Sequence, residues 1–399
     1  MEVLSSWQQE FEGLMRRIRP RFVRSQSWVW AKAYLQGLLS DMPRKNNWQL
    51  AESLGEPNPY GLQQFLYRAK WEADDIRDDL CGYVVKQLGD PEAVLVIDET
   101  GFVKKGPHSV GVQVQYCGTA GRTTNCQVGV FLAYASPKGA TLLDRALYLP
   151  ESWTSDRPRC RQVGVPDEVA FATKPELARQ LLHRAVEAGV PAAWVTGDSV
   201  YGGHSGLRNW LEAGPLAYVL ALSPKDTEIN LQWWPQRVST WLAELPSEGW
   251  TRLSAGEGSK GPRLYDWLRL PLYDPALAGW KRWLLLRRSL TDPSQVTPYA
   301  CFAPAATSLE TLVRVAGTRW TIESSFESTK QEVGLDEYEV RTYQGWYRHI
   351  TLACLAHAFL TVLRAHGLDP LTEAEKKTRQ APHPSSLSTF KARRGLICR

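Results

Sequence analysis

Three carboxylates at widely separated positions have the residue types of a divalent metal centre. Asp98 follows the apolar run VLVI and Asp198 follows AWVTG, so each acid ends a segment typical of a buried strand. Glu323 lies within RWTIESSFESTK, where the sequence predicts a helix. Such acids repel one another unless cations neutralise them, and Mg²⁺ prefers carboxylate, water and phosphate oxygens. Two ions held in this way can activate a water or a 3′-hydroxyl for attack on a phosphodiester.

Helical spacing places two cations beside the third acid. At about 100° per residue, Arg319, Glu323 and Lys330 fall within roughly 40° of one another, so a metal ligand would lie between two phosphate-binding cations. Glu327 lies near the same face and is an alternative third carboxylate. Each acid also has a structural interpretation, since a strand-end Asp often caps a turn and Glu323 could form a surface ion pair with Arg319. The ordered combination is more specific than any single acid.

The elements that position these acids can be predicted from the spacing of apolar residues. Short apolar runs indicate buried strands, alternation indicates a half-buried strand, and recurrence every three to four residues indicates a helix. The predicted strands are 93–98, 111–118, 126–136, 192–198 and 217–222, and the predicted helices are 175–189, 207–214, 308–332 and 345–366. Together they predict an α/β fold in which the acids meet at one edge of a mixed sheet.

Segments of different character flank and interrupt this α/β region. The first 90 or so residues have helical patterns with a break or kink at Pro20. Within them, 48–55 and 62–71 resemble a helix-turn-helix, and an ordinary helical hairpin fits equally well. Residues 223–300 are rich in Trp, Pro and Gly and contain short alternating segments, which indicates a β-rich insertion. The basic end of the chain has the composition of a loosely structured tail.

Charge is distributed unevenly along the 399 residues, whose net charge is +5. Residues 1–50 hold eight Lys and Arg against four acids, and 341–399 hold ten against three. Basic ends around a near-neutral middle suit a protein that binds a polyanion at several points, although a solvated surface has the same composition.

Cysteine usage and hydropathy exclude several classes of protein. The seven cysteines are scattered without a C-x-x-C pair, which argues against a disulfide framework and a structural zinc site. No apolar run approaches the ~20 residues needed to cross a bilayer. The N-terminus has no basic-then-apolar signal pattern, so a cytoplasmic location is predicted, with no membrane association.

The segments that hold the acids resemble a known family. The chain is similar to the DDE transposases of bacterial insertion sequences, in particular the insertion-sequence 701 family, a relative of the insertion-sequence 4 group. The similar stretches run through residues ~90–365 and are VLVIDETGFVKKG (94–106), QYCGTAGRTTNCQVGVFLAYAS (115–136), LYLPESWTSDRPRC (147–160), FATKPELA (171–178), WVTGDSVYG (194–202), RWTIESSFESTKQEVGLDEYEVR (319–341) and GWYRHITLACLAHAFL (345–360). Many long matches in the same order are much more specific than a lone acidic triad.

The resemblance implies a ribonuclease H-like catalytic core with a β-rich insertion before the last acidic helix. It also implies a helical DNA-binding region before the core. The expected domains are the DNA-binding region at 1–90, the catalytic core at 91–222 and 301–366, the insertion at 223–300, and a basic C-terminal tail at 367–399.

The family's catalytic and metal-binding acids map onto Asp98, Asp198 and Glu323. Relatives carry a Tyr-x₂-Arg-x₃-Glu-x₆-Lys signature around the last acid, and Arg319 and Lys330 match it. The residues that depart from the family pattern are Ala316 at the tyrosine position and Ser199 where relatives often have an acid.

Further residues are expected to contact DNA. Trp320 falls where relatives place an aromatic residue near the strand end, so it could stack on an unpaired base, and a core tryptophan is the alternative. The cations after the first catalytic strand, which could contact the DNA backbone or simply be solvated, are Lys104, Lys105 and Arg122. Tyr201 and His204, beside Asp198, could position DNA.

The activity implied by the resemblance is cut-and-paste transposition. The enzyme would cut at transposon ends and transfer the strands into target DNA, using two Mg²⁺ ions for which Mn²⁺ can substitute. Its partners would be double-stranded DNA and a second copy of the chain, because two active sites act on two ends, and it would be associated with the nucleoid. Two alternatives stay open at this point: a domesticated or inactive relative that only binds DNA, and a nuclease of the same fold without strand transfer.

Overall fold

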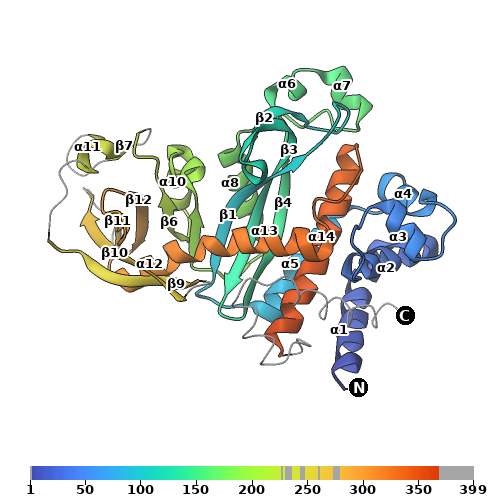
Figure 1. The fold of residues 1–399 in the computed structure, drawn as a ribbon, viewed down its shortest axis with the longest axis horizontal. Coiled ribbons are helices and arrows are strands. Elements are labelled where there is room, and N and C mark those ends of the chain that lie inside the picture. The colour runs from blue at the N-terminus through green and yellow to red at the C-terminus, as the bar shows by residue number, and fades with distance from the viewer. Residues whose placement is uncertain are drawn as a thin grey trace.

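A large mixed sheet forms the centre of the computed structural model, which describes residues 2–225, 228–229, 236–242, 248–258, 261–272 and 279–367 (Figure 1). The strand order of this ten-stranded sheet is β2-β3-β1-β5-β6-β12-β11-β10-β9, and β4 pairs with β3. Its strands are β1 Val94–Val103, β2 Gln113–Cys117, β3 Arg122–Ser136, β4 Gly139–Tyr148, β5 Trp194–Gly197, β6 Ala217–Ala221, β9 Thr251–Gly258, β10 Gly261–Pro271, β11 Trp280–Arg288 and β12 Val296–Pro304. The predicted mixed α/β architecture is confirmed.

Helices cover this sheet and form the N-terminal part of the chain (Figure 1). The helices before the sheet are α1 Glu2–Ile18, α2 Ser25–Leu39, α3 Asn47–Ser53, α4 Tyr60–Tyr67 and α5 Ala73–Leu88. Those between the strands are α6 Glu151–Thr154, α7 Arg157–Gln162, α8 Lys174–Glu187, α9 Ser199–Gly202, α10 Ser205–Glu212 and α11 Val238–Leu242. Those after the sheet are α12 Leu309–Thr318, α13 Trp320–Val333 and α14 Tyr343–Ala365. Two 3₁₀ turns, Arg19–Arg21 and Gly118–Ala120, and a small hairpin of β7 Glu228–Ile229 with β8 Gln236–Arg237 complete the described elements.

The parallel pairing of β1 ends just before the first predicted acid. β1 pairs in parallel with β5 as far as Ile97 opposite Gly197, whereas its antiparallel pairing with β3 continues to Val103 opposite Cys126. The prediction that Asp98 ends its strand is therefore wrong, because Asp98 lies inside β1 opposite Phe131. It lies instead at the point where the parallel neighbour stops.

The predicted long helix over 308–332 is two helices. α12 ends at Thr318 and α13 begins at Trp320, with Arg319 between them. Two features coincide with this break. A Cβ added at Gly317 would lie 1.9 Å from the carbonyl oxygen of Ala255, so β9 presses against the last turn of α12. The Thr321 hydroxyl donates to the carbonyl of Thr318, at 2.8 Å, and such bonds compete with the regular helix pattern.

The N-terminal helices are helical as predicted and pack against the helices of the core. Arg348, on α14 and 1% exposed, donates to the carbonyl oxygens of Leu66 in the last turn of α4 and of Ala69 after it, at 3.0 and 2.6 Å. Lys45 Nζ donates to the carbonyl oxygens of Ser40 after α2 and Glu332 on α13, at 2.8 and 2.5 Å. These buried cations satisfy carbonyls that helix ends leave unpaired, so they join the first 90 residues to the rest of the chain.

The cysteines, the apolarity of the helices and the C-terminal tail are the remaining features predicted from composition. Of the cysteines in the described residues, five are buried and Cys81 is half-buried, and all six are free thiols. None of the described helices combines the length and apolarity that a membrane span requires. The predicted basic tail at 367–399 lies outside the described residues except for Gly367.

Candidate active site

Parallel pairing brings the two predicted aspartates to neighbouring positions. Ile97 on β1 is opposite Gly197 on β5, and Asp98 and Asp198 are the next residues of their chains. The main chain holds one oxygen of each acid: Oδ1 of Asp98 accepts from the Glu99 amide at 2.8 Å, and Oδ1 of Asp198 accepts from the Val200 amide at 2.9 Å. Asp198 thereby caps the first turn of α9.

Helix α13 carries the third predicted acid, which is connected to the first through an arginine. Nη2 of Arg319 lies 3.0 Å from Oε1 of Glu323, and Nη1 of the same guanidinium lies 3.7 Å from Oδ2 of Asp98. Glu323 is thus connected to Asp98 through a shared cation. The alternative acid, Glu327, is exposed, as Glu323 is, and accepts a hydrogen bond from Gln331 at 3.2 Å. It is Glu323 that shares a cation with Asp98.

Crowding and burial make the aspartates difficult to ionise. Burial, followed by the charges of Asp198 and Glu99, raises the pKa of Asp98 to about 7. Burial, followed by the charge of Glu99, also raises the pKa of Asp198. Half-buried carboxylates close to one another are stabilised by a cation, so these oxygen donors fit a hard divalent ion such as Mg²⁺.

Arg319 provides that cation in the present arrangement. Within the described parts of the chain, no three His, Cys, Asp or Glu side chains are grouped closely enough to hold a metal ion. The separation of Asp98 from Glu323 is consistent with the position of Arg319 between these two acids.

The other cations of the predicted signature occupy defined positions near the acids. Lys330 Nζ donates to the hydroxyls of Thr100 and Thr119, at 2.8 and 2.9 Å, and burial lowers its pKa. Trp320 is half-buried, and the guanidinium carbons of Arg263 and Arg319 lie 5.5 and 5.1 Å from its ring centroid. Trp320 is therefore accessible on part of its surface and lies next to two guanidinium groups.

The predicted DNA contacts after β1 differ in accessibility. Lys105 and Arg122 are exposed. Lys104 is half-buried: its Nζ lies 3.5 Å from the ring centroid of Tyr338 and donates to the carbonyl oxygen of that residue at 3.2 Å. Burial lowers the pKa of Lys104 to about 8. Lys105 and Arg122 are thus more accessible than Lys104.

Two residues beside Asp198 have structural contacts. Tyr201 is 0% exposed and donates to Oε2 of Glu99 at 2.5 Å, so the expectation that it positions DNA directly is wrong. Nδ1 of His204 accepts from the Leu207 amide at 3.0 Å and caps α10. The sequence analysis did not single out Glu99. Because Glu99 directly follows Asp98, its side chain faces the opposite side of the strand.

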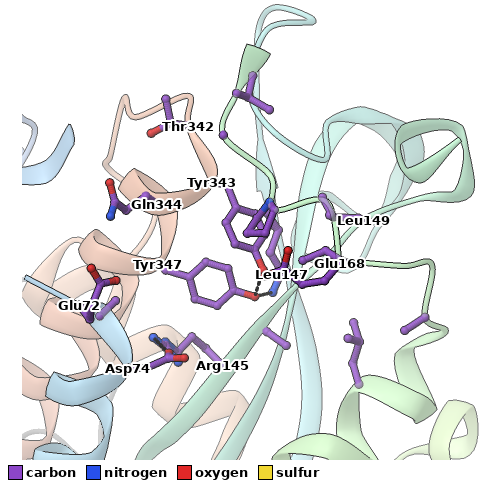
Figure 2. Close-up of a pocket in the computed structure, with 18 of the residues that line it drawn as sticks. Glu72, Asp74, Arg145, Leu147, Leu149, Glu168, Thr342, Tyr343, Gln344 and Tyr347 are labelled. Carbon is purple, nitrogen blue, oxygen red and sulfur yellow. Dashed lines mark hydrogen bonds and ion pairs between the residues drawn. The ribbon is translucent and has the colours of Figure 1, made fainter. Parts of the chain in front are cut away.

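A separate cavity of about 1150 Å³ lies away from these acids, between β4, α5, α8 and the start of α14 (Figure 2). Several of its polar groups are paired within the protein. Arg145 donates to Asp74 and Thr351, both at 2.8 Å, and the Tyr347 hydroxyl accepts from the Leu147 amide at 3.1 Å. None of the three predicted acids lines this cavity.

Two protein families match the segments that hold the three predicted acids. The DDE superfamily endonuclease family matches residues 17–228, and the transposase DDE domain family matches residues 170–359. The probable transposase for insertion sequence element IS701 of Microchaete diplosiphon is 33% identical over 167 residues, which cover 42% of this chain and 41% of that relative. The match to the transposase DDE domain family and the likeness to the insertion-sequence 701 transposase confirm the family predicted from the sequence motifs. Because the first match covers more than half of the 399 residues, the chain belongs to the DDE superfamily of endonucleases.

Proposed function

We propose that this protein is a DDE transposase that cuts DNA at transposon ends and joins those ends to target DNA. The observation that carries the proposal is the placement of Asp98 and Asp198 on neighbouring parallel strands, with Arg319 connecting Asp98 to Glu323. Two half-buried aspartates with raised pKa values, connected to an exposed glutamate through Arg319, supply oxygen ligands suited to divalent cations.

Each residue of the site has a role in this proposal. Asp98, Asp198 and Glu323 would hold two Mg²⁺ ions, with Mn²⁺ as a substitute. When bound, such ions supply an activated water or 3′-hydroxyl and stabilise the leaving oxygen. Arg319 releases its carboxylates and binds a phosphate, since a guanidinium matches either anion. Lys330, held by two Thr hydroxyls, presents a second cation on the same side of β1.

The organisation of the chain supports the same proposal. The order of strands β3, β1, β5 and β6, with α8 connecting β4 to β5, is consistent with a ribonuclease H-like core. The strands β9, β10 and β11, which precede α13, are consistent with a β-rich insertion before the last acidic helix. The N-terminal helices would bind DNA, and a dimer would bring two ends together.

The test is cleavage and joining of a labelled transposon-end duplex in Mg²⁺ or in EDTA. We expect metal-dependent cutting and joining in the wild type, and loss of both with retained DNA binding in Asp98→Ala, Asp198→Ala and Glu323→Ala. Glu327→Ala is the matched control and is expected to stay active. The opposite pattern in Glu323→Ala and Glu327→Ala would show that the third acid is misassigned.

The two alternative functions give different products in the same assay. A nuclease without strand transfer would release cut ends and never join them to a target duplex. A domesticated DNA-binding relative would shift the end duplex in a gel and leave it uncut in both Mg²⁺ and Mn²⁺.

A further inference from the structure

Behind Asp98, on the opposite face of β1, Glu99 is held by two donors from different elements. Lys174 Nζ, at the start of α8, lies 2.6 Å from Oε1 of Glu99, and the Tyr201 hydroxyl, on α9, lies 2.5 Å from Oε2. The Glu99 side chain is 19% exposed and Tyr201 is 0% exposed. Each carboxylate oxygen of Glu99 therefore already has a strong donor.

These contacts connect the strand of Asp98 to the helical turn of Asp198. Tyr201 is three residues after Asp198, and Asp198 caps the turn that contains it. The next residue, Gly202, presses on β6: an added Cβ would lie 1.8 Å from the carbonyl oxygen of Ala221. The α9 turn is thus fixed to β6 by a close backbone contact and to β1 by the Tyr201–Glu99 bond.

Lys174 supplies the positive charge that compensates the carboxylate of Glu99. Glu99 is a third carboxylate beside Asp98 and Asp198, and its charge is among the causes that raise the pKa of each. Lys174 begins α8, where a capping box between Thr173 and Glu176 fixes the first turn. The ammonium group is therefore held in place, and it neutralises the acid that faces away from the site.

We propose that Glu99, Lys174 and Tyr201 form a positioning cluster that sets the separation of Asp98 and Asp198, and through it the affinity of the site for a divalent cation. The inference rests on the proposed function and deepens it. Mg²⁺ requires near-ideal octahedral geometry with short metal–oxygen distances, so a displaced ligand weakens its binding. Residues that orient metal ligands through hydrogen bonds commonly change metal affinity by 10- to 100-fold when removed.

The chain contains a matched control for this cluster. The hydroxyl of Tyr218, a residue 2% exposed on β6, donates to Oε1 of Glu212 at 2.6 Å. Arg282 Nη2 lies 2.6 Å from Oε2 of the same carboxylate. This second Tyr–Glu–cation cluster has the same chemistry and lies at the start of β6, beside Val195 rather than beside Asp198.

The experiment compares Tyr201→Phe and Lys174→Met with Tyr218→Phe in the full-length chain. Mn²⁺ is titrated into each protein, free Mn²⁺ is measured by electron paramagnetic resonance, and binding that persists in Asp98→Ala is subtracted. Tm is measured without metal. We expect the Kd for Mn²⁺ to rise about tenfold in Tyr201→Phe and in Lys174→Met, and to change less than about twofold in Tyr218→Phe.

Comparable losses of Tm in the two Tyr→Phe variants, with a change of Mn²⁺ affinity only in Tyr201→Phe, would support the positioning role. Equal Mn²⁺ affinity in Tyr201→Phe, Lys174→Met and wild type would overturn it and leave the proposed function intact. Absence of Asp98-dependent Mn²⁺ binding in the wild type would overturn both proposals. Lys174→Met keeps the test decisive if Tyr201→Phe does not fold, because the Lys174 side chain is 27% exposed.

Discussion

Nη1 of Arg319 lies 3.7 Å from Oδ2 of Asp98, so the residue between helices α12 and α13 contacts the strand that carries the first acid. The same guanidinium holds Glu323. One side chain therefore connects a strand acid to a helix acid. An arginine placed in this way can pass from carboxylate to phosphate without leaving the site.

Arg319→Ala is expected to slow cleavage of a transposon-end duplex by about 100-fold, because it removes a donor aimed at the reacting phosphate. Single-turnover rates at saturating protein measure this effect. Arg314→Ala is the control, since its side chain is 48% exposed and lies 3.9 Å from Glu92, and it is expected to retain the wild-type rate. A rate for Arg319→Ala within twofold of wild type would contradict the assigned role.

Asp98→Asn is expected to raise Tm in metal-free buffer, and by more at pH 8 than at pH 5. Burial and the charge of Asp198 raise the pKa of Asp98 from 3.8 to about 7. The folded protein therefore binds this proton more tightly than the unfolded chain, so stability falls as pH rises from about 4 to about 7. The advantage of the amide should grow between pH 5 and pH 8 by on the order of 2–3 kcal/mol.

Asp292→Asn is a control in which Tm is expected to change in the opposite direction. Hydrogen bonds from Ser294 hold the pKa of Asp292 below its usual range, so the ionised form stabilises the fold and its amide should lower Tm at neutral pH.

Added Mg²⁺ should raise the Tm of wild type and leave that of Asp98→Asn unchanged. If the gain in Tm of Asp98→Asn over wild type stayed constant from pH 5 to pH 8, Asp98 would be shown to ionise normally.

Gly317→Ala is expected to destabilise the protein by about 1–3 kcal/mol. The added Cβ would lie 1.9 Å from the carbonyl oxygen of Ala255, so α12 or β9 must shift. Gly13→Ala, inside α1, meets nothing within 4 Å and should be neutral or stabilising. Urea unfolding of both variants measures the difference, and equal midpoints would refute the close approach of β9 and α12.

Lys105→Ala and Arg122→Ala are each expected to weaken DNA binding at every sequence and to reduce the slope of log K against log salt by about one. Lys104→Ala should instead lower Tm, because Lys104 packs on the Tyr338 ring and donates to its carbonyl oxygen. Filter binding over a salt series, together with thermal unfolding, separates the two effects. A full unit of salt slope lost in Lys104→Ala would mean that this lysine contacts phosphate after all.

Local patterns in the sequence determined most elements and the position of the acids within them. The apolar runs before Asp98 and Asp198 are β1 and β5, and the amphipathic pattern at 175–189 is α8. These predictions succeed because burial of one face and capping of one end depend on residues that are close in sequence. The choice of the three acids also came from motifs shared with a family, and it still requires the proposed cleavage test.

Only the tertiary structure decided what each acid contacts. Glu99 bonds Lys174 and Tyr201 across 75 and 102 residues of chain, and Asp98 contacts Arg319 from another element. The extension of β1 past Asp98 and the break at Arg319 likewise depend on β3 and on the Ala255 backbone. Such contacts are set by strand order and packing, which a periodicity of two or of 3.6 residues does not encode.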